Sequence, residues 1–181
     1  MDTYATPMPR PADTADFERL LAEHPGIVAK VAASYAFDRH DRADLAQEIR
    51  LQLWHGWSGY DPARPFATWM YRVALNVAIS WRRRQPRAPH ESLGSEHEDL
   101  VGARDVDAES HQRLALVQQA MHSLGALDRA LLLLHLEGCS HRASGDVLGI
   151  SETNAATRLG RIRQHLRRLA GDPSGDDHGT D

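Results

Sequence analysis

DLAQEIRLQLWHGWSGYDPARPFATWMYRVALNVAISWRRR, residues 44–84, decides how this chain folds. The stretch predicts a helix, a loop punctuated by glycine and proline, and a second helix that ends in three consecutive arginines. Carboxylates mark one face of the first helix, and arginines mark one face of the second. A small unit with two oppositely charged faces indicates two different partners and is unlike an enzyme pocket.

The first of these helices carries apolar residues every fourth position, at Leu45, Ile49 and Leu53, which are predicted to face inward. The opposite face carries Asp44, Gln47, Glu48 and Leu51. Such a face is ordinarily only solvated. The apolar Leu51 in its middle favours a contact surface instead, so both interpretations stand on the residues alone.

The second helix is predicted to bury an apolar stripe of Phe66, Met70, Val73, Val77 and Trp81. Arg72, Asn76 and Arg83 fall on a different face. Because asparagine lowers helix propensity, Asn76 is interpreted either as a buried hydrogen-bonding residue or as a reader of bases.

Aromatic residues accompany the arginines of this helix at Trp69, Tyr71 and Trp81. Single-stranded nucleic acid uses this combination for stacking and phosphate contact, although all three aromatics suit a core equally well, and Trp81 is assigned to it. In the preceding loop SGYDPARPF, two prolines and a glycine predict a rigid, preset pocket.

The charge map gives the domain boundaries. The formal net charge of −4 hides a basic block at residues 82–87, another at 158–168, and acidic residues between them. Few apolar residues occur in 85–110, which indicates a linker. The chain is predicted to divide into a disordered N-terminus (1–13), a helical unit (14–84), an acidic and proline-containing linker (85–110), a second helical unit (111–170) and an acidic tail (171–181). No segment has strand alternation, so the predicted fold class is all-α, with two small helical domains joined by a flexible linker.

The second unit is predicted to begin with helices at 111–124 and 126–137. Ser140 then caps a short helix that Gly149 ends, and a long helix starts at Glu152. The long helix has an apolar side: Ala155, Leu159, Ile162, Leu166 and Leu169. Its other side carries Thr153, Thr157, Arg161, Gln164 and Arg168. This pattern is a helix-turn-helix, with Gly145 where the two helices approach closely.

Composition excludes other classes of function. The single cysteine, Cys139, makes no internal disulfide, which suits a reducing cytosol. No apolar run approaches the roughly 20 residues of a membrane span, and the N-terminus lacks signal-peptide features. His135, Cys139 and His141 lack a fourth ligand, so no metal and no cofactor are predicted. No hydrolase or nucleotide-binding motif occurs, and we expect a protein that is not an enzyme.

Three motifs in this order resemble the extracytoplasmic-function type of bacterial sigma-70 factors, over most of residues 14–170. DLAQEIRLQLW resembles the region 2 helix that docks on the β′ clamp helices of RNA polymerase. YDPARPFATWMYRVALN resembles the segment that recognises the −10 element, with Asn76 at the base-contacting asparagine. LGISETNAATRLGRIRQHL resembles the region 4 helix that meets the −35 element.

The resemblance implies a cytoplasmic sigma factor whose partners are core RNA polymerase (β′ clamp helices and β flap), promoter DNA and an anti-sigma factor, without membrane insertion. It places core-polymerase binding at Asp44, Gln47, Glu48 and Leu51. It places −10 DNA binding at Tyr60, Asp61, Arg64, Phe66, Trp69, Arg72, Asn76, Arg82 and Arg83. It places −35 DNA binding at Thr153, Asn154, Thr157, Arg158 and Arg161.

The second unit departs from the family pattern. Ser144 and Ala155 are smaller than the usual aliphatic residues, which predicts looser packing, and Ala156 and Gly160 remove side chains expected near the −35 element. Two other functions are therefore kept: a stand-alone helix-turn-helix regulator that binds duplex DNA, and an interaction protein that mimics a sigma factor. The interpretation as a stand-alone regulator gives residues 44–84 no role.

Overall fold

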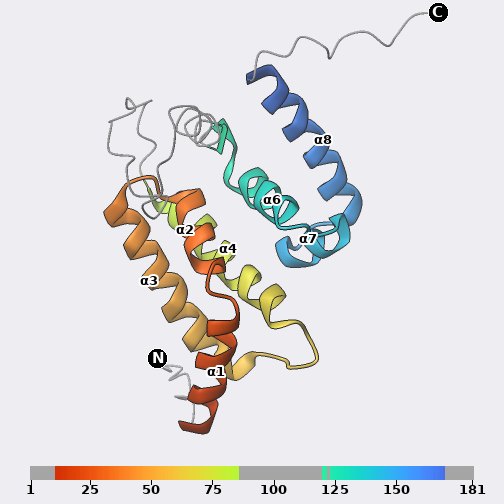
Figure 1. Cartoon of the computed structure of the whole chain (residues 1–181). Helices are drawn as coiled ribbons and strands as arrows, with labels where there is room; N and C mark the ends of the chain where they lie inside the picture. Colours follow the sequence, from red (N-terminus) through yellow and green to blue (C-terminus); the bar gives the residue numbers. More distant parts are fainter. Residues whose placement is uncertain (1–10, 86–119, 122, 170–181) are drawn as a thin grey trace, which may run out of the picture.

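The computed structural model describes residues 11–85, 120–121 and 123–169, and within these ranges the fold is entirely helical (Figure 1). The elements in chain order are α1 (Pro11–Glu23), α2 (Ile27–Tyr35), α3 (Arg39–Gly56), the short 3-10 helix η1 (Trp57–Gly59), α4 (Phe66–Arg84), α6 (Ala126–Leu136), α7 (His141–Leu148) and α8 (Glu152–Leu169). The all-α prediction is confirmed. Helix α1 begins at Pro11, inside the predicted N-terminal tail. Most of the predicted linker, most of the expected helix at 111–124 and the acidic tail lie outside the described residues.

Local chemistry accounts for the helix boundaries of the first unit, α1–α4. Pro25 and Gly26 lie in the break between two helices, since α1 ends at Glu23 and α2 begins at Ile27. Helix α3 is capped by Asp38, whose Oδ1 accepts hydrogen bonds from the backbone N–H of His40 at 2.7 Å and of Asp41 at 3.2 Å. These bonds to the charged form lower the pKa of the Asp38 carboxyl.

The buried faces of α3 and α4 differ in how well the sequence predicted them. Leu45, Ile49 and Leu53 of α3 are each 0% exposed, as predicted. On α4, Phe66 and Met70 are buried, but Val73, Val77 and Trp81 are only half-buried. The buried positions of α4 also include Tyr71, Ala74, Leu75 and Ala78. The predicted stripe was therefore displaced, because α4 is covered on one side by α2 and α3 and on another by α6 and α7.

The second unit, α6–α8, contains the predicted helix-turn-helix. Ser140 caps α7 by accepting a hydrogen bond from the Ala143 N–H at 3.1 Å, and Gly149 ends it at φ +70°. Gly145 lies where predicted, because a Cβ there would come within 2.6 Å of the Ile150 carbonyl oxygen. On α8 the predicted apolar side is buried from Ala155 to Ile162 and half-buried at Leu166. Leu169 is 46% exposed, contrary to prediction, since the last turn of α8 extends past the helices it packs on.

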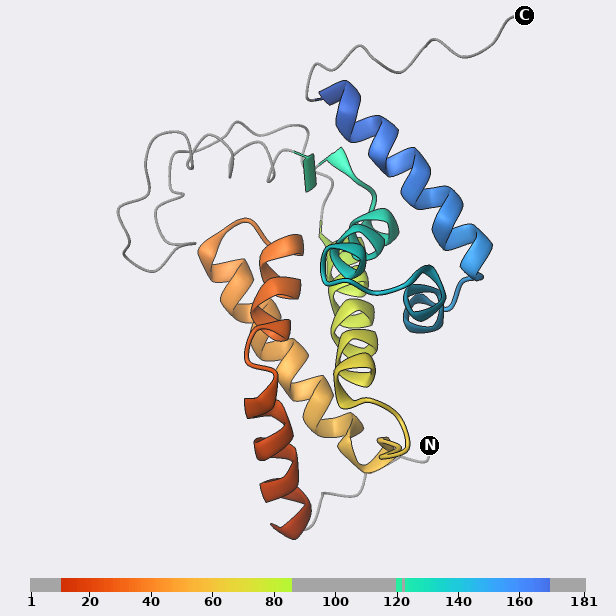
Figure 2. The ribbon, with the colours of Figure 1, turned by 45° about the vertical axis from the view of Figure 1, so that its right-hand side comes forward.

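The two units pack together around α6 (Figure 2). One side of α6 contributes Ala130, Leu133 and Leu134 to the same apolar cluster as the first unit, and Val147 of α7 joins them. The other side faces α8, where a second cluster gathers Met121, Leu124, Leu131, Leu132, Ala155, Leu159 and Ile162. Helix α6 therefore separates the first unit from α8 and is in contact with both.

Candidate polymerase and nucleic-acid interfaces

The acidic face of α3 is presented to solvent. Asp44, Gln47 and Leu51 are exposed, and Leu51 keeps 49% of its surface accessible although it is apolar. Glu48 is half-buried and accepts a hydrogen bond from Arg84 Nη2 at 3.0 Å. An exposed leucine bordered by acidic and amide side chains suits docking on a basic protein surface with an apolar centre.

The loop between α3 and α4 is braced internally, which agrees with its predicted rigidity. The Tyr60 hydroxyl donates to the Arg64 carbonyl at 2.7 Å, and Asp61 Oδ1 accepts from the Ala63 N–H at 3.0 Å. The side chains of Arg64 and Asp61 approach to 3.7 Å and both remain exposed. Residues 60–65 thus hold a fixed shape at the start of α4.

An aromatic cluster packs against this loop through the ring of Tyr60. Phe66 is 5% exposed and packs edge-on against Tyr60, with ring centroids 5.4 Å apart, and against Trp57 at 6.2 Å. Tyr60 stacks on Trp57 at 5.3 Å, and Trp69 lies 5.2 Å from Tyr60. Among the proposed DNA contacts, Phe66 is thus a supporting residue, while Tyr60 and Trp69 are half-buried at the rim.

Sequence reasoning missed one member of this cluster, Trp57. Trp57 touches the rings of Phe17, Tyr60, Phe66 and Trp69, and the sequence analysis gave it no role. The available signal was the concentration of aromatic residues at 54–69. That concentration indicates a cluster, but it does not reveal which rings pack against one another.

The exposed face of α4 decides between the two interpretations of Asn76, as a buried hydrogen-bonding residue or as a reader of bases. Arg72, Asn76 and Arg83 are all exposed on one side of the helix, so Asn76 is not a buried hydrogen-bonding residue. Arg82 is half-buried. Tyr71 is 6% exposed and donates its hydroxyl to Glu137 Oε2 at 3.0 Å, which removes it from the aromatics available for stacking. This face therefore exposes the Asn76 amide between Arg72 and Arg83.

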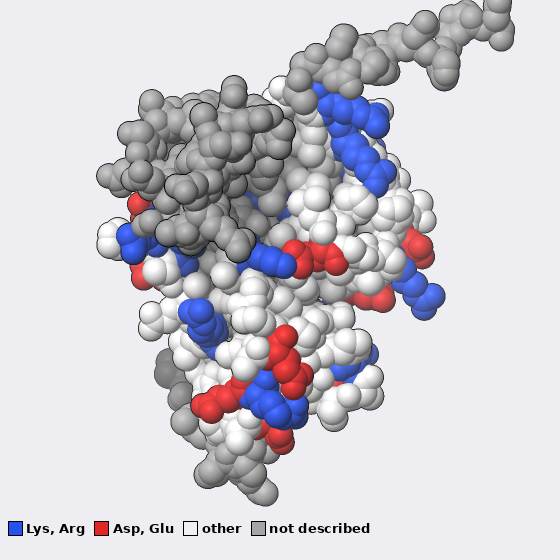
Figure 3. Space-filling view, viewed as in Figure 1, with Lys and Arg blue, Asp and Glu red and all other residues white. Residues whose placement is uncertain are grey.

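The outer face of α8 brings together most of the predicted −35 residues. Thr153, Asn154, Thr157 and Arg161 are exposed. Arg158 is occupied within the protein: it pairs with Asp128 Oδ1 at 2.7 Å and donates to Asn154 Oδ1 at 3.0 Å. Further along α8, exposed arginines make its C-terminal half a basic surface (Figure 3): Arg161, Arg163, Arg167 and Arg168.

The ranges that the structure describes contain neither a metal-binding cluster nor a membrane-spanning helix. There, no three His, Cys, Asp or Glu side chains gather where they could hold a metal ion, and this includes the set around Cys139. None of the described helices is long and apolar enough to cross a membrane.

Comparison with known families identifies both units. The family model described as Sigma-70 region 2 matches residues 20–88, and the one described as Sigma-70, region 4 matches residues 114–166. The first match contains the acidic face of α3, the braced loop and the solvent face of α4. The second contains α6, the helix-turn-helix and nearly all of α8.

Individual relatives agree with these matches. RNA polymerase sigma factor CnrH of Cupriavidus metallidurans is 32% identical over 166 residues, which cover 84% of this chain and 85% of the relative. ECF RNA polymerase sigma factor SigE of Mycolicibacterium smegmatis is 31% identical, over 83% of this chain and 60% of the relative. The solved structure of CnrH in complex with the cytosolic domain of CnrY superimposes with a TM-score of 0.65 at 25% identity, covering 89% of this chain and 91% of that one.

Proposed function

The chain belongs to the extracytoplasmic-function group of sigma-70 RNA polymerase sigma factors, and we propose that it directs core polymerase to promoters through the three surfaces described above. One observation carries this assignment of surfaces. Within a single unit, α3 exposes Leu51 among acidic groups while α4 exposes Asn76 between arginines. A protein that only binds DNA has no use for the first surface, and a protein that only binds polymerase has no use for the second.

The acidic face of α3 is the proposed polymerase contact. Asp44, Gln47 and Glu48 supply charge and hydrogen-bond acceptors for the β′ clamp helices, and Leu51 supplies the apolar anchor. Interfaces of this kind gain most of their affinity from a few anchors, with charge governing the rate of encounter and the choice of partner. The β flap is the proposed second polymerase contact, made by the second unit.

The braced loop and the solvent face of α4 are the proposed −10 surface. Drawing a base out of the stack costs a few kcal/mol, and binding to the internally braced loop of residues 60–65 returns part of this energy, because the loop does not have to become ordered first. Asn76 presents an amide that hydrogen-bonds to a base edge, and Arg72, Arg82 and Arg83 balance phosphate charge. Preferential binding of the opened strand then favours melting, and we propose no catalytic step and no enzymatic activity.

The outer face of α8 is the proposed −35 surface. Thr153, Asn154, Thr157 and Arg161 face outward for the major groove of the duplex, whereas Arg158 is engaged with Asp128. The basic C-terminal half of α8 adds phosphate contacts that carry no sequence information.

The proposal also includes a place of action and a regulator. Because core polymerase and promoters are cytoplasmic, so is the proposed site of action. The solved CnrH structure holds that sigma factor in complex with the cytosolic domain of CnrY. We propose that this chain too has a protein partner that restrains it, an anti-sigma factor.

Reconstituted transcription tests the function. The purified full chain is mixed with core RNA polymerase and promoter fragments, and run-off transcripts are measured together with core binding. Initiation at specific promoters is the expected result. Duplex binding without core polymerase favours a stand-alone regulator, and core binding without initiation favours a mimic; each of these results overturns the proposal.

A surface variant sharpens this test. Leu51→Ala removes an exposed side chain, so it leaves the fold intact and is expected to weaken core binding at least about tenfold, as loss of an interface anchor does. Glu18→Ala is the control, because Glu18 is exposed on α1, outside both proposed polymerase contacts. Equal loss of core binding in the two variants would contradict the assignment of the α3 surface.

A further inference from the structure

One arginine of α8 connects α6 to the outer face of α8. Arg158 Nη1 donates to Asp128 Oδ1 of α6 at 2.7 Å, and Arg158 Nε donates at 3.0 Å to Asn154 Oδ1, one turn earlier on α8. The Arg158 and Asp128 side chains are 35% and 33% exposed, whereas Asn154 is exposed. A row of three side chains therefore leads from the partly buried contact between the helices to the outer face of α8.

Packing between α6 and α8 fixes the backbone on which this row is built (Figure 2). Ala155 and Leu159 of α8 are 0% and 1% exposed, and they share an apolar cluster with Leu131 of α6. Asp128 lies in the first turn of α6, where the helix dipole favours a carboxylate. Buried contacts thus set the rotation of α8 about its axis, and Arg158 meets a charge whose place is already fixed.

The bond from Arg158 also decides how the Asn154 amide is turned. A guanidinium has N–H donors and no acceptor, so it bonds to the amide oxygen and not to the amide nitrogen. The planar fork of the guanidinium, held at Nη1 by Asp128, directs Nε toward that oxygen. Because the oxygen and the nitrogen diverge from one carbon, the nitrogen and its two N–H donors are directed away from Arg158.

Asn154 occupies a position from which a recognition helix reads bases. Its backbone N–H donates to Ser151 Oγ at 3.2 Å, which places it in the first turn of α8. In helix-turn-helix proteins, residues near the N-terminus of the second helix contact base edges in the major groove. Asn154 shares the outer face of α8 with Thr157 and Arg161, three and seven residues further on. Its amide is therefore placed to meet a base pair of the −35 element.

An amide whose oxygen is already bonded selects a different base from a free amide. A free asparagine reads adenine with both of its ends, since the oxygen accepts from N6 and the nitrogen donates to N7. In this protein Arg158 holds the oxygen of Asn154, which leaves the N–H donors for a base. Guanine presents two neighbouring acceptors, N7 and O6, whereas adenine presents one acceptor beside a donor. An amide that only donates therefore favours guanine.

We propose that Asp128 and Arg158 are positioning residues that hold the Asn154 amide as a donor, so that Asn154 prefers guanine over adenine at one base pair of the −35 element. The inference rests on the proposed function, because it needs α8 to lie in the major groove of a promoter. Arg158 acts through Asn154 and does not itself contact a base. Asp128, a residue of α6, thereby influences which base α8 selects.

Promoter selection by the reconstituted holoenzyme tests the inference. A promoter on which the full chain and core RNA polymerase initiate is randomised in its −35 element, and each fragment carries a transcribed barcode that identifies its sequence. Counting barcodes in the run-off transcripts gives the preference for each base at each position. Each preference is a ratio within one protein, so a variant with lower total activity still gives a valid ratio.

Three variants follow the row of side chains. Asn154→Ala locates the base pair, because it removes the preference there, and the parent is expected to favour guanine over adenine at that pair by at least about fivefold. Arg158→Met keeps an apolar stem but removes the donors, so it releases the Asn154 oxygen and is expected to shift the ratio toward adenine by about fivefold or more. Asp128→Asn removes the charge that holds Arg158 and is expected to shift the ratio in the same direction by a smaller factor.

Arg163→Ala is the matched control. Arg163 is also an exposed arginine of α8 that contacts α6, since its Nη2 lies 3.1 Å from His135 Nε2, but it lies about two and a half turns beyond Asn154. The variant is expected to lower total transcription, as the loss of a phosphate contact does, and to leave the guanine-to-adenine ratio unchanged.

Other results overturn the inference. A parent that does not prefer guanine at the base pair located by Asn154→Ala contradicts the donating amide, and an Asn154→Ala variant with the parent's preferences at every position removes Asn154 as a reader. Arg158→Met and Asp128→Asn variants that keep the parent's ratio contradict the positioning role. A preference that Arg158→Met loses at a different base pair makes Arg158 itself a reader.

Failure of the inference and failure of the proposed function give different results. A parent protein that initiates with core polymerase at no promoter overturns the sigma function, and the inference falls with it. Specific initiation by the parent, with a guanine-to-adenine ratio that none of the three variants changes, overturns the inference alone.

Discussion

Arg129 and Tyr35 each reach into the other's half of the protein. The guanidinium carbon of Arg129 lies 5.3 Å from the centroid of the Tyr35 ring, while the Tyr35 hydroxyl donates to the Ala126 carbonyl one turn before Arg129. Burial raises the pKa of Tyr35, which keeps its hydroxyl protonated and able to donate. Burial, opposed by Tyr35 and assisted by the nearby charge of Arg82, lowers the pKa of Arg129 to about 10, so Arg129 remains a cation at neutral pH.

The first prediction concerns this pair. Arg129→Ala is expected to lower the free energy of unfolding by about 3 kcal/mol, because it leaves the carbonyls of Ser34 and Leu124 without their buried donor and removes the ring contacts. Equilibrium unfolding in urea measures the change. Arg19→Ala, at an exposed arginine of α1, is the control and is expected to change stability by less than about 0.5 kcal/mol. Similar losses in both variants would contradict the structural role of Arg129.

The second prediction compares two glycine substitutions. Gly145→Ala is expected to cost about 2 kcal/mol or more, because its Cβ would lie 2.6 Å from the Ile150 carbonyl oxygen, a backbone atom that has little room to move. Gly160→Ala in α8 meets no atom within 4 Å and is expected to stabilise by about 0.5–1 kcal/mol through helix propensity. Thermal unfolding of both variants is the measurement. A stabilising Gly145→Ala would mean that α7 and α8 are not in close contact at this point.

The third prediction compares two serines at α7. Ser144 is 0% exposed, and its Oγ has no hydrogen-bond partner among the described residues. Ser144→Ala is therefore expected to raise the free energy of unfolding by about 1 kcal/mol, since it removes a buried, unpaired hydroxyl. Ser140→Ala removes the N-cap hydrogen bond from the Ala143 N–H and is expected to lower the free energy of unfolding by about 1 kcal/mol. Chemical denaturation compares them, and a change of the same sign in both would contradict the prediction.

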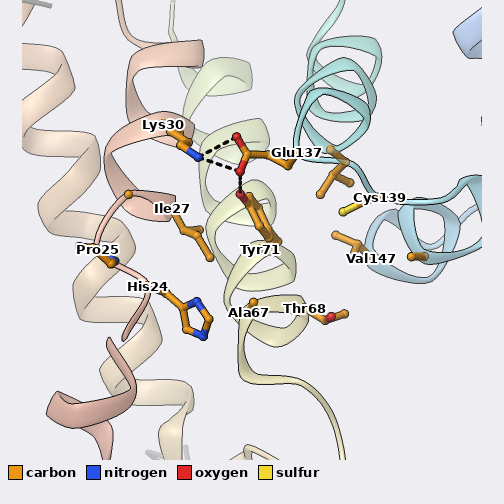
Figure 4. A pocket seen from close by; sticks show the side chains of 13 residues that line it. His24, Pro25, Ile27, Lys30, Ala67, Thr68, Tyr71, Glu137, Cys139 and Val147 are labelled. Atoms are coloured by element: carbon orange, nitrogen blue, oxygen red, sulfur yellow. Dashed lines mark hydrogen bonds and ion pairs between the residues drawn. The ribbon is translucent and has the colours of Figure 1, made fainter. Parts of the chain in front are cut away.

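The fourth prediction concerns the acid sensitivity of the contact between Glu137, which follows α6, and the Lys30 and Tyr71 side chains of the first unit (Figure 4). The hydrogen bonds from Lys30 and Tyr71 lower the pKa of Glu137 below the ordinary glutamate value. A carboxyl with a depressed pKa stabilises the folded protein at pH values above that ordinary value, and this contribution is lost as the pH falls through the lowered pKa. Acidification from neutral pH is therefore expected to lower the free energy of unfolding, measured by urea denaturation at a series of pH values.

Glu137→Gln is the control for this titration, because its amide keeps a similar shape and does not ionise. The variant is expected to lack the acid-dependent step that belongs to Glu137, while other carboxyl groups titrate equally in both proteins. Identical pH profiles of stability for the parent and Glu137→Gln would show that the ionised Glu137 carboxylate does not stabilise the contact with Lys30 and Tyr71.

The fifth prediction separates the two DNA surfaces. Arg161→Ala is expected to reduce transcription from the cognate promoter and to leave core binding unchanged, because Arg161 is exposed on α8. Asn76→Ala is expected to reduce initiation by the roughly tenfold or more that a lost base contact costs, with duplex binding by α8 preserved. Run-off transcription and core binding are measured in parallel. Loss of core binding in either variant would contradict the assignment of that residue to a DNA-binding surface.

Periodicity predicted much of the fold because the helices are amphipathic and well capped. The buried face of α3, the break before α2, the cap at Ser140 and the close approach at Gly145 follow from residues within a few positions of each other. The prediction was wrong on α4, where Val73 and Val77 were expected to be buried and Tyr71 is buried instead. A helix covered on two sides has no single apolar stripe.

The sequence by itself determined that this chain is an all-helical sigma factor with a region 2 and a region 4, because those features are written in motifs local to each helix. Only the tertiary structure decided that Asn76 is exposed, that Phe66 supports the loop, and that Glu137 and Arg129 fasten one unit to the other. Lys30 and Glu137 are 107 residues apart in the chain. No local pattern encodes such a pairing, since it exists only once both units have folded and packed.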